Sequence, residues 1–147
     1  MEPQSPKDPI ADLVAVDDRY HRDAYLFLRD ALEYTQRTLK REVGGKTRHI
    51  TGQELLEGIR EHALKEYGPM ALTVLAEWGI QRSEDFGEIV FNMVEVGWLA
   101  KTERDSRADF ENGYDFDEAF VKPFLPKHKQ VAQALEIKRA QSSETKP

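Results

Sequence analysis

The spacing of apolar residues between about Arg19 and Glu42 leaves the fewest choices for local structure. Apolar side chains recur there every three or four positions, which is the period of a helix with one buried face. The residues on this face are Tyr20, Ala24, Phe27, Leu28, Ala31, Leu32 and Leu39. Two consecutive glycines, Gly44 and Gly45, predict the end of the helix. The sequence therefore predicts one long, half-buried helix over about 19–42.

A second helix is predicted by its own capping residues. Thr51-Gly-Gln-Glu54 matches a capping box, in which the Thr51 hydroxyl accepts from the Glu54 amide and the Glu54 carboxylate accepts from the Thr51 amide. The residues that this helix buries are Leu55, Ile59, Ala63 and Tyr67. Gly68 ends the helix, and Pro69 begins the next one because proline fits the first turn of a helix.

Three shorter helices are predicted around these two. One covers 9–16, with Asp8 as its N-cap. Another covers 69–78 and ends at Gly79, which allows Ile80 to pack back on the helix. The third begins with Ser83 as N-cap and ends at Gly97. Its inward-facing residues are Phe86, Ile89, Val90 and Met93.

A small β-hairpin is predicted after the last of these helices. Residues 98–102 and 110–116 have the composition and alternation of two strands, joined by a polar turn over 103–109. Asn112-Gly113 offers a second place for the tight turn, which would shorten both strands. Residues 117–124 are expected to form one or two further helical turns, ended by prolines.

The order of these elements predicts a mainly α fold with a small β-hairpin, arranged as a winged-helix-like single domain over 9–126. Residues 48–51 could supply a third short strand. The alternative is an irregular helical bundle with one hairpin. Residues 1–8 are expected to be a disordered tail, and 127–147 a polar extension that is frayed or disordered from about 138.

The composition of the chain limits the classes of protein to which it can belong. The 147 residues include no cysteine, which excludes disulfides and thiolate metal sites and fits a reducing compartment, so we expect a cytoplasmic protein. No apolar run approaches the roughly 20 residues that cross a bilayer, and no secretory signal precedes residue 9. A net charge of -6 disfavours non-specific attraction to membranes and nucleic acids. The oligomeric state is left open.

Short matches to catalytic and metal-binding motifs do not extend to complete sites. Gly44-Gly-Lys-Thr47 resembles the end of a phosphate-binding loop, but Lys40 stands where the first glycine is required. His21-Arg-Asp23 lacks the rest of the kinase signature. Glu61 and His62 lie on a helix with too few further ligands for zinc. We therefore predict no catalytic residue, no metal and no cofactor.

Charge is distributed unevenly. The helix after Ser83 carries Glu84, Asp85 and Glu88 and no lysine or arginine between 84 and 96, so this face would repel a nucleic acid and suit a basic protein surface. The most basic segment outside the C-terminal extension is 37–48, which could hold a phosphate backbone. Its cationic residues are Arg37, Lys40, Arg41, Lys46 and Arg48.

Aromatic residues accompany the acidic segment that follows. They are Tyr114, Phe116, Phe120 and Phe124. Aromatic side chains mostly belong to a core, and that interpretation is favoured here. If Tyr114 and Phe116 are exposed, they become anchors of an interface.

Several stretches of the chain resemble a bacterial protein family of about 150 residues for which no activity is known. The stretches are RYHRDAY (19–25), RHITGQELLEGIRE (48–61), YGPMALTVLAEWGI (67–80), SEDFGEIVFNMVE (83–95) and YDFDEAFVKPFLP (114–126). The resemblance covers nearly all of 9–126. It implies relationship, and it implies no activity, cofactor or catalytic residue.

Two functions follow from the sequence. We expect a non-enzymatic protein-interaction or regulatory module that binds a protein through its acidic helix and hairpin face. The binding residues would be Glu84, Asp85, Glu88, Tyr114 and Phe116. The alternative is an RNA- or ribosome-associated factor that uses the basic segment 37–48.

Overall fold

The protein is mainly helical. The computed structural model describes residues 2–3, 10–42 and 49–126. The α-helices in these ranges are α1 (Ile10–Val16), α2 (Arg22–Glu42), α3 (Gly52–Tyr67), α4 (Ala71–Glu77) and α5 (Ser83–Glu95). Short helical turns complete the chain as η1 (Gly68–Met70), η2 (Arg107–Phe110), η3 (Asp117–Val121) and η4 (Lys122–Phe124). The strands are β1 (Glu2–Pro3) and β2 (Leu99–Ala100).

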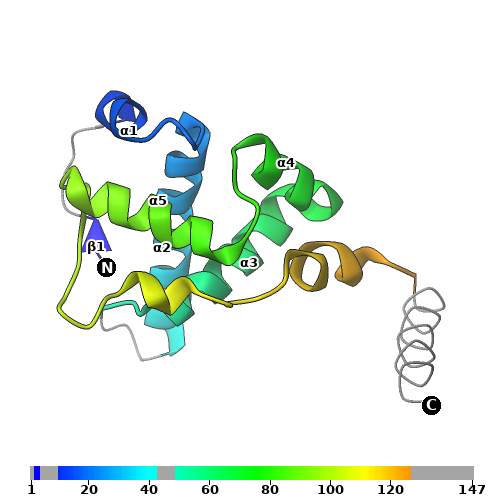
Figure 1. Cartoon of the computed structure of the whole chain (residues 1–147). Coiled ribbons are helices and arrows are strands. Elements are labelled where there is room, and N and C mark those ends of the chain that lie inside the picture. The colour runs from blue at the N-terminus through cyan, green and yellow to red at the C-terminus, as the bar shows by residue number, and fades with distance from the viewer. Residues whose placement is uncertain (1, 4–9, 43–48, 127–147) are drawn as a thin grey trace, which may run out of the picture.

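Helix α2 is the element on which the other helices are assembled. It packs on α1, α3 and α5, and Figure 1 shows α5 lying across it. The predicted inward face of α2 is buried from Tyr20 to Leu32, and Leu39 at its end is half-buried against the core. One hydrophobic core runs from Ile10 to Phe120. The helix predicted from apolar spacing is therefore confirmed.

The predicted start of α3 is also confirmed. The Glu54 amide donates to the Thr51 hydroxyl at 3.2 Å, and the Thr51 amide donates to the Glu54 carboxylate at 3.0 Å. After α4, the Ile80 amide donates to the Leu75 carbonyl at 2.9 Å, as expected for the turn at Gly79. The start of α3 and the turn at the end of α4 are thus confirmed, whereas α4 begins at Ala71 rather than at Pro69, because Gly68–Met70 form the separate turn η1.

Helix α5 begins at Ser83 but is capped differently from the prediction. The Asp85 carboxylate accepts hydrogen bonds from the amides of Gln81 and Arg82 at 2.9 and 3.2 Å. Ser83 is not the N-cap, because its hydroxyl is directed to the segment after η2. The capping group therefore comes from within the first turn of the helix.

The predicted hairpin between 98–102 and 110–116 is wrong. Strand β2 pairs antiparallel with β1, with Glu2 opposite Ala100 and Pro3 opposite Leu99. Ser106 and Asp109 form a capping box that starts η2, so the backbone turns where an extended strand was expected. Asn112-Gly113 does not form a hairpin turn either, because the Gly113 amide donates to Ser83 Oγ at 3.0 Å.

Without that hairpin, a winged-helix-like arrangement is not confirmed. Residues 49–51 form no strand, and residue 48 lies outside the described ranges. Two residues of the expected N-terminal tail, Glu2 and Pro3, form β1. Residues 1, 4–8 and 127–147 lie outside the described part of the chain. Of the helices in the described ranges, none has both the length and the apolar character that crossing a bilayer requires.

Candidate functional site

A buried serine joins α5 to the segment that follows η2. Ser83 Oγ lies 2.7 Å from the Phe110 carbonyl oxygen and 2.9 Å from a Glu84 carboxylate oxygen. It also accepts a hydrogen bond from the Gly113 amide at 3.0 Å. Because these contacts bridge 27 to 30 positions of sequence, they hold residues 110–116 against the start of α5.

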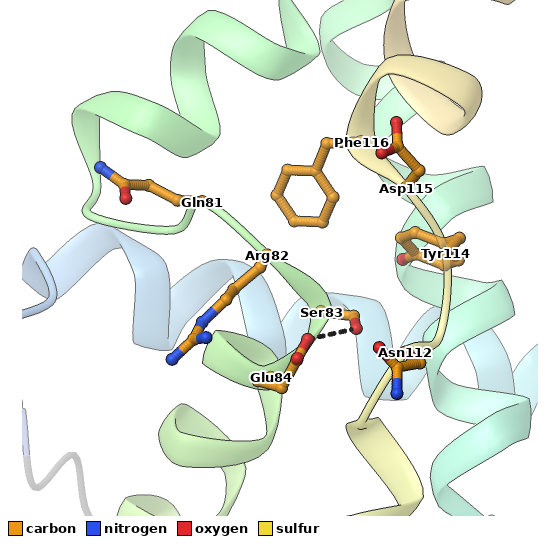
Figure 2. A pocket seen from close by; sticks show the side chains of 8 residues that line it. All are labelled: Gln81, Arg82, Ser83, Glu84, Asn112, Tyr114, Asp115 and Phe116. Carbon is orange, nitrogen blue, oxygen red and sulfur yellow. Dashed lines mark hydrogen bonds between the residues drawn. The ribbon is translucent and has the colours of Figure 1, made fainter. Parts of the chain in front are cut away.

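A pocket of about 370 Å³ lies between these two parts of the chain. We call it the α5 pocket, and Figure 2 shows how the two chain segments face each other across it. It is lined by Gln81, Arg82, Ser83, Glu84, Asn112, Tyr114, Asp115 and Phe116. Glu84, Tyr114 and Phe116 were predicted to belong to one binding face, and the structure brings these three side chains together around the pocket.

The aromatic lining of the α5 pocket is held in place by the core. The Tyr114 hydroxyl donates to the Leu56 carbonyl at 2.9 Å, and burial raises the pKa of this phenol well above its usual value. Phe116 is 8% exposed and lies with its ring centroid 5.1 Å from that of Phe120 and 5.7 Å from that of Phe86. The favoured interpretation of Phe116 and Phe120 as core residues is confirmed. Phe124, by contrast, is 42% exposed.

Charged groups of both signs surround the pocket mouth. Arg82 and Asp115 are exposed, and Glu84 is half-buried. Asp115 Oδ1 also accepts hydrogen bonds from the Asp117 and Glu118 amides at 2.8 and 3.2 Å, which caps η3. Within the described residues, no ion pair joins Arg82 to Glu84 or to Asp115. The pocket can therefore offer both a cation and carboxylates to a ligand.

The other two acidic residues of the predicted face stabilise the fold. Asp85 accepts a hydrogen bond from the Tyr20 hydroxyl at 2.7 Å, in addition to the two amides that it caps. Glu88 lies 3.3 Å from the Arg19 guanidinium and 3.6 Å from that of Arg107. Neither residue lines the α5 pocket. Their negative charge is offset locally and is not presented to a partner as a continuous acidic surface.

Arg19 also anchors a polar network that the sequence analysis missed. Its guanidinium donates to both oxygens of Asp17, at 2.9 and 2.8 Å, and Asn92 of α5 donates to Asp17 at 2.8 Å. These hydrogen bonds, that of Arg19 first, lower the pKa of Asp17 to about 2. The pair of Asp17 and Arg19 is local, at two positions apart, but the contact with Asn92 could not be found from neighbouring residues, because Asn92 lies 75 positions from Asp17.

The predicted basic segment is only partly described. Arg37 and Lys40 are exposed on α2, whereas the side chain of Arg41 and all of Lys46 and Arg48 lie outside the described residues. Arg37 shares a depression of about 280 Å³ with three carboxylates and a histidine, so acids surround it. These neighbours are Asp30, Glu33, His62 and Glu66. RNA binding by 37–48 stays a prediction.

A further depression, with polar residues along its edge, lies between α2 and α3. We call it the α2–α3 groove. It encloses about 200 Å³ and is lined by Tyr34, Thr35, Thr38, Leu39, Glu54, Glu57, Gly58 and Glu61. In the part of the chain that the structure describes, no group of three or more histidine or acidic side chains is arranged to hold a metal ion.

Comparison with models of known protein families, with curated proteins and with solved structures found no match. The resemblance of the sequence to a bacterial family stays a prediction.

Proposed function

We propose that this protein is a non-enzymatic protein-interaction module that binds a short segment of a partner protein in the α5 pocket. The observation that carries the proposal is the combination of a fixed aromatic lining with charges of both signs at the mouth. Apolar area provides affinity in such sites, and a few placed polar groups provide orientation and specificity.

The charge of the mouth favours a partner segment that carries a basic side chain. Glu84 and Asp115 contribute two carboxylates, and Arg82 contributes one cation. A basic residue of the partner can approach the carboxylates, while an acidic or amide group pairs with Arg82. The partner therefore has a mixed polar sequence around an apolar residue that contacts the half-buried Tyr114, while Phe116, which is 8% exposed, supports the pocket from the core.

The test exchanges the charges at the mouth without changing net charge. In the double variant Arg82→Glu, Glu84→Arg, two of the three charges at the mouth are reversed and Asp115 is unchanged, and we expect recovery of the specific partner to fall about tenfold, equivalent to about 1.4 kcal/mol. Recovery is measured by affinity capture from a lysate of the source organism with quantitative mass spectrometry.

The matched control is Glu95→Arg, Lys101→Glu, which exchanges two exposed charges away from the pocket. Thermal unfolding of both variants shows whether folding is retained. A partner that is recovered equally by the wild type and by both variants would refute binding at the α5 pocket.

A further inference from the structure

The α2–α3 groove exists because the two helices approach unusually closely at one point. A Cβ atom added at Gly58 would lie 1.7 Å from Thr35 Oγ1 and 2.8 Å from Thr35 Cβ. Only a residue without a side chain fits there. The approach brings the two helix backbones together and places the side chains on either side of Gly58 along the edges of a shallow groove.

The interior of the groove is apolar although two threonines line it. Thr35 Oγ1 donates to the Ala31 carbonyl at 2.7 Å, and Thr38 Oγ1 donates to the Tyr34 carbonyl at 3.0 Å. Both hydroxyls are thus satisfied by their own helix. Leu39 and the Tyr34 ring complete a surface that can accept an aliphatic side chain.

The edge of the groove is acidic. Glu54, Glu57 and Glu61 lie on one face of α3 at helical spacing, and the described residues that line the groove include no lysine or arginine. Glu57 is exposed and pairs with Arg60 at its outer side, and Glu61 accepts a hydrogen bond from the Tyr34 hydroxyl at 3.2 Å. Two cations also lie close by, since Arg60 pairs with Glu57 and Lys65 Nζ lies 5.7 Å from the centroid of the Tyr34 ring. The apolar interior and the excess of carboxylates among the described lining residues are complementary to a basic amphipathic segment.

This chain carries such a segment. Residues 127–147 contain five lysines and arginines against two glutamates, a net charge of +3, whereas the whole chain has a net charge of -6. Val131 and Leu135 are four positions apart, so they would share a face of a helix, and Lys138 and Arg139 follow them. The segment thus combines apolar and cationic side chains in the way that the groove requires.

We propose that residues 127–147 of the same chain dock in the α2–α3 groove. Val131 and Leu135 cover the apolar interior, and Lys138 and Arg139 lie beside Glu57 and Glu61. This inference concerns a different surface from the α5 pocket and does not rest on the proposed function.

Covalent attachment favours this occupant over a free peptide of equal charge. The described chain ends at Pro126, shortly after η3, which packs on α3 and α4. Val131 and Leu135 follow Pro126 by five and nine positions. Five extended residues span up to about 17 Å and one helical turn adds about 6 Å, which is close to the length of about 24 Å of the 16-residue α3. Because η3 packs on α3, this length lets the segment follow α3 towards the groove, and tethering gives it an effective concentration of order millimolar.

The other acidic depressions fit the segment less well. The depression beside His62 is predominantly polar and includes Arg37, which would repel Lys138 and Arg139. The α5 pocket includes Arg82. Of these three sites, the α2–α3 groove alone combines a mainly apolar lining with the absence of lysine and arginine among the lining residues that the structure describes.

The absence of native cysteine allows a direct distance measurement. In the full chain, Lys40→Cys and Ala140→Cys would each carry a spin label, one at the exposed end of α2 and one in the segment. Double electron–electron resonance should give a narrow distribution of short distances. The distribution should broaden and lengthen at 1 M salt, where the screening length falls to about 3 Å.

Charge reversal in the segment changes none of the residues that the structure describes. With Lys138→Glu and Arg139→Glu, the short distances should be lost. The control pair Arg22→Glu and Lys101→Glu changes net charge equally at exposed sites elsewhere and should leave the distances unchanged. Adding Glu57→Lys and Glu61→Lys to the segment variant should restore them.

Two outcomes would overturn the proposal. A broad distribution that is identical in the wild type, the segment variant and the control would show that the groove does not hold this segment. Loss of the short distances when labelled chain is diluted with unlabelled chain would assign the groove to the segment of a second copy. Either result leaves binding at the α5 pocket to be judged by its own capture experiment.

Discussion

The first turns of α5 and the exposed face of α3 are both rich in carboxylates, yet the structure uses them differently. On α5, Asp85 binds the Tyr20 hydroxyl and caps its own helix, and Glu88 lies between Arg19 and Arg107. On α3, Glu57 and Glu61 line an open groove. The partners of Asp85 and Glu88 come from other parts of the fold, whereas Glu57 pairs with Arg60 of its own helix and stays exposed at the groove edge.

The largest effect should come from the close approach that forms the groove. Gly58→Ala adds a methyl group where Thr35 Oγ1 lies 1.7 Å away, so the helices must separate and stability should fall by about 3 kcal/mol. At an ordinary helix position the same change would add about 1 kcal/mol of stability. Denaturant unfolding gives the value. Thr35→Ala in the same chain should recover part of the loss, and a stabilised Gly58→Ala variant would contradict the described packing.

The next largest effect is a difference in stability between variants of two neighbouring acidic residues of α5. Asp85→Ala leaves the Tyr20 hydroxyl and the capped amides without their acceptor and should cost about 2 kcal/mol. Glu84→Ala, at a half-buried site on the pocket mouth, should cost less than about 0.5 kcal/mol. Equal losses for the two variants in thermal unfolding would remove the distinction between structural and surface carboxylates.

A smaller effect concerns acid stability. Hydrogen bonding to Arg19 lowers the pKa of Asp17 from 3.8 to about 2. A lowered carboxyl pKa stabilises the folded protein above about pH 4, and this stabilisation is lost as the pH falls from 4 to 2. Allowing for screening by solvent, we expect a contribution of about 1 kcal/mol. Asp17→Asn should flatten the fall in unfolding free energy over this range, and an unchanged pH profile would contradict the assignment.

The smallest effect on stability is expected for a carboxylate of α3. Glu57 is exposed and its pair with Arg60 is a surface ion pair, so Glu57→Gln should change stability by less than about 0.5 kcal/mol. Chemical denaturation of this variant beside Asp85→Ala measures the contrast directly. A loss above about 1 kcal/mol would place Glu57 among the structural carboxylates.

Much of the helical framework was predictable from neighbouring residues. The capping box of Thr51 and Glu54 and the turn at Gly79 involve groups three to five positions apart, and both were predicted correctly. The hairpin was predicted wrongly. Residues 110–116 alternate in the way that a strand does, but Phe110 and Phe116 are each buried by contacts with other parts of the fold, and alternation in the sequence does not show such contacts. The partner of β2 could not be predicted either, because β1 lies at the opposite end of the chain.

The candidate site was predicted in part. Glu84, Tyr114 and Phe116 were expected to share a face, because acidic and aromatic residues cluster in those two segments of the sequence, and they line one pocket in the structure. That they bind a partner stays a prediction. The contributions of Arg82 and Asn112, and the loss of Asp85 and Glu88 from the site, depend on how the segments meet.

The sequence alone predicted where most helices begin and end, which of their faces are apolar, and which segments are acidic or basic. These properties depend on residues within about one helical turn of each other. Which carboxylates remain available to a ligand was settled by contacts across the fold, such as Asp85 with Tyr20 and Asp17 with Asn92. A side chain has one set of hydrogen-bonding sites, and whether a distant partner occupies them depends on how the helices pack.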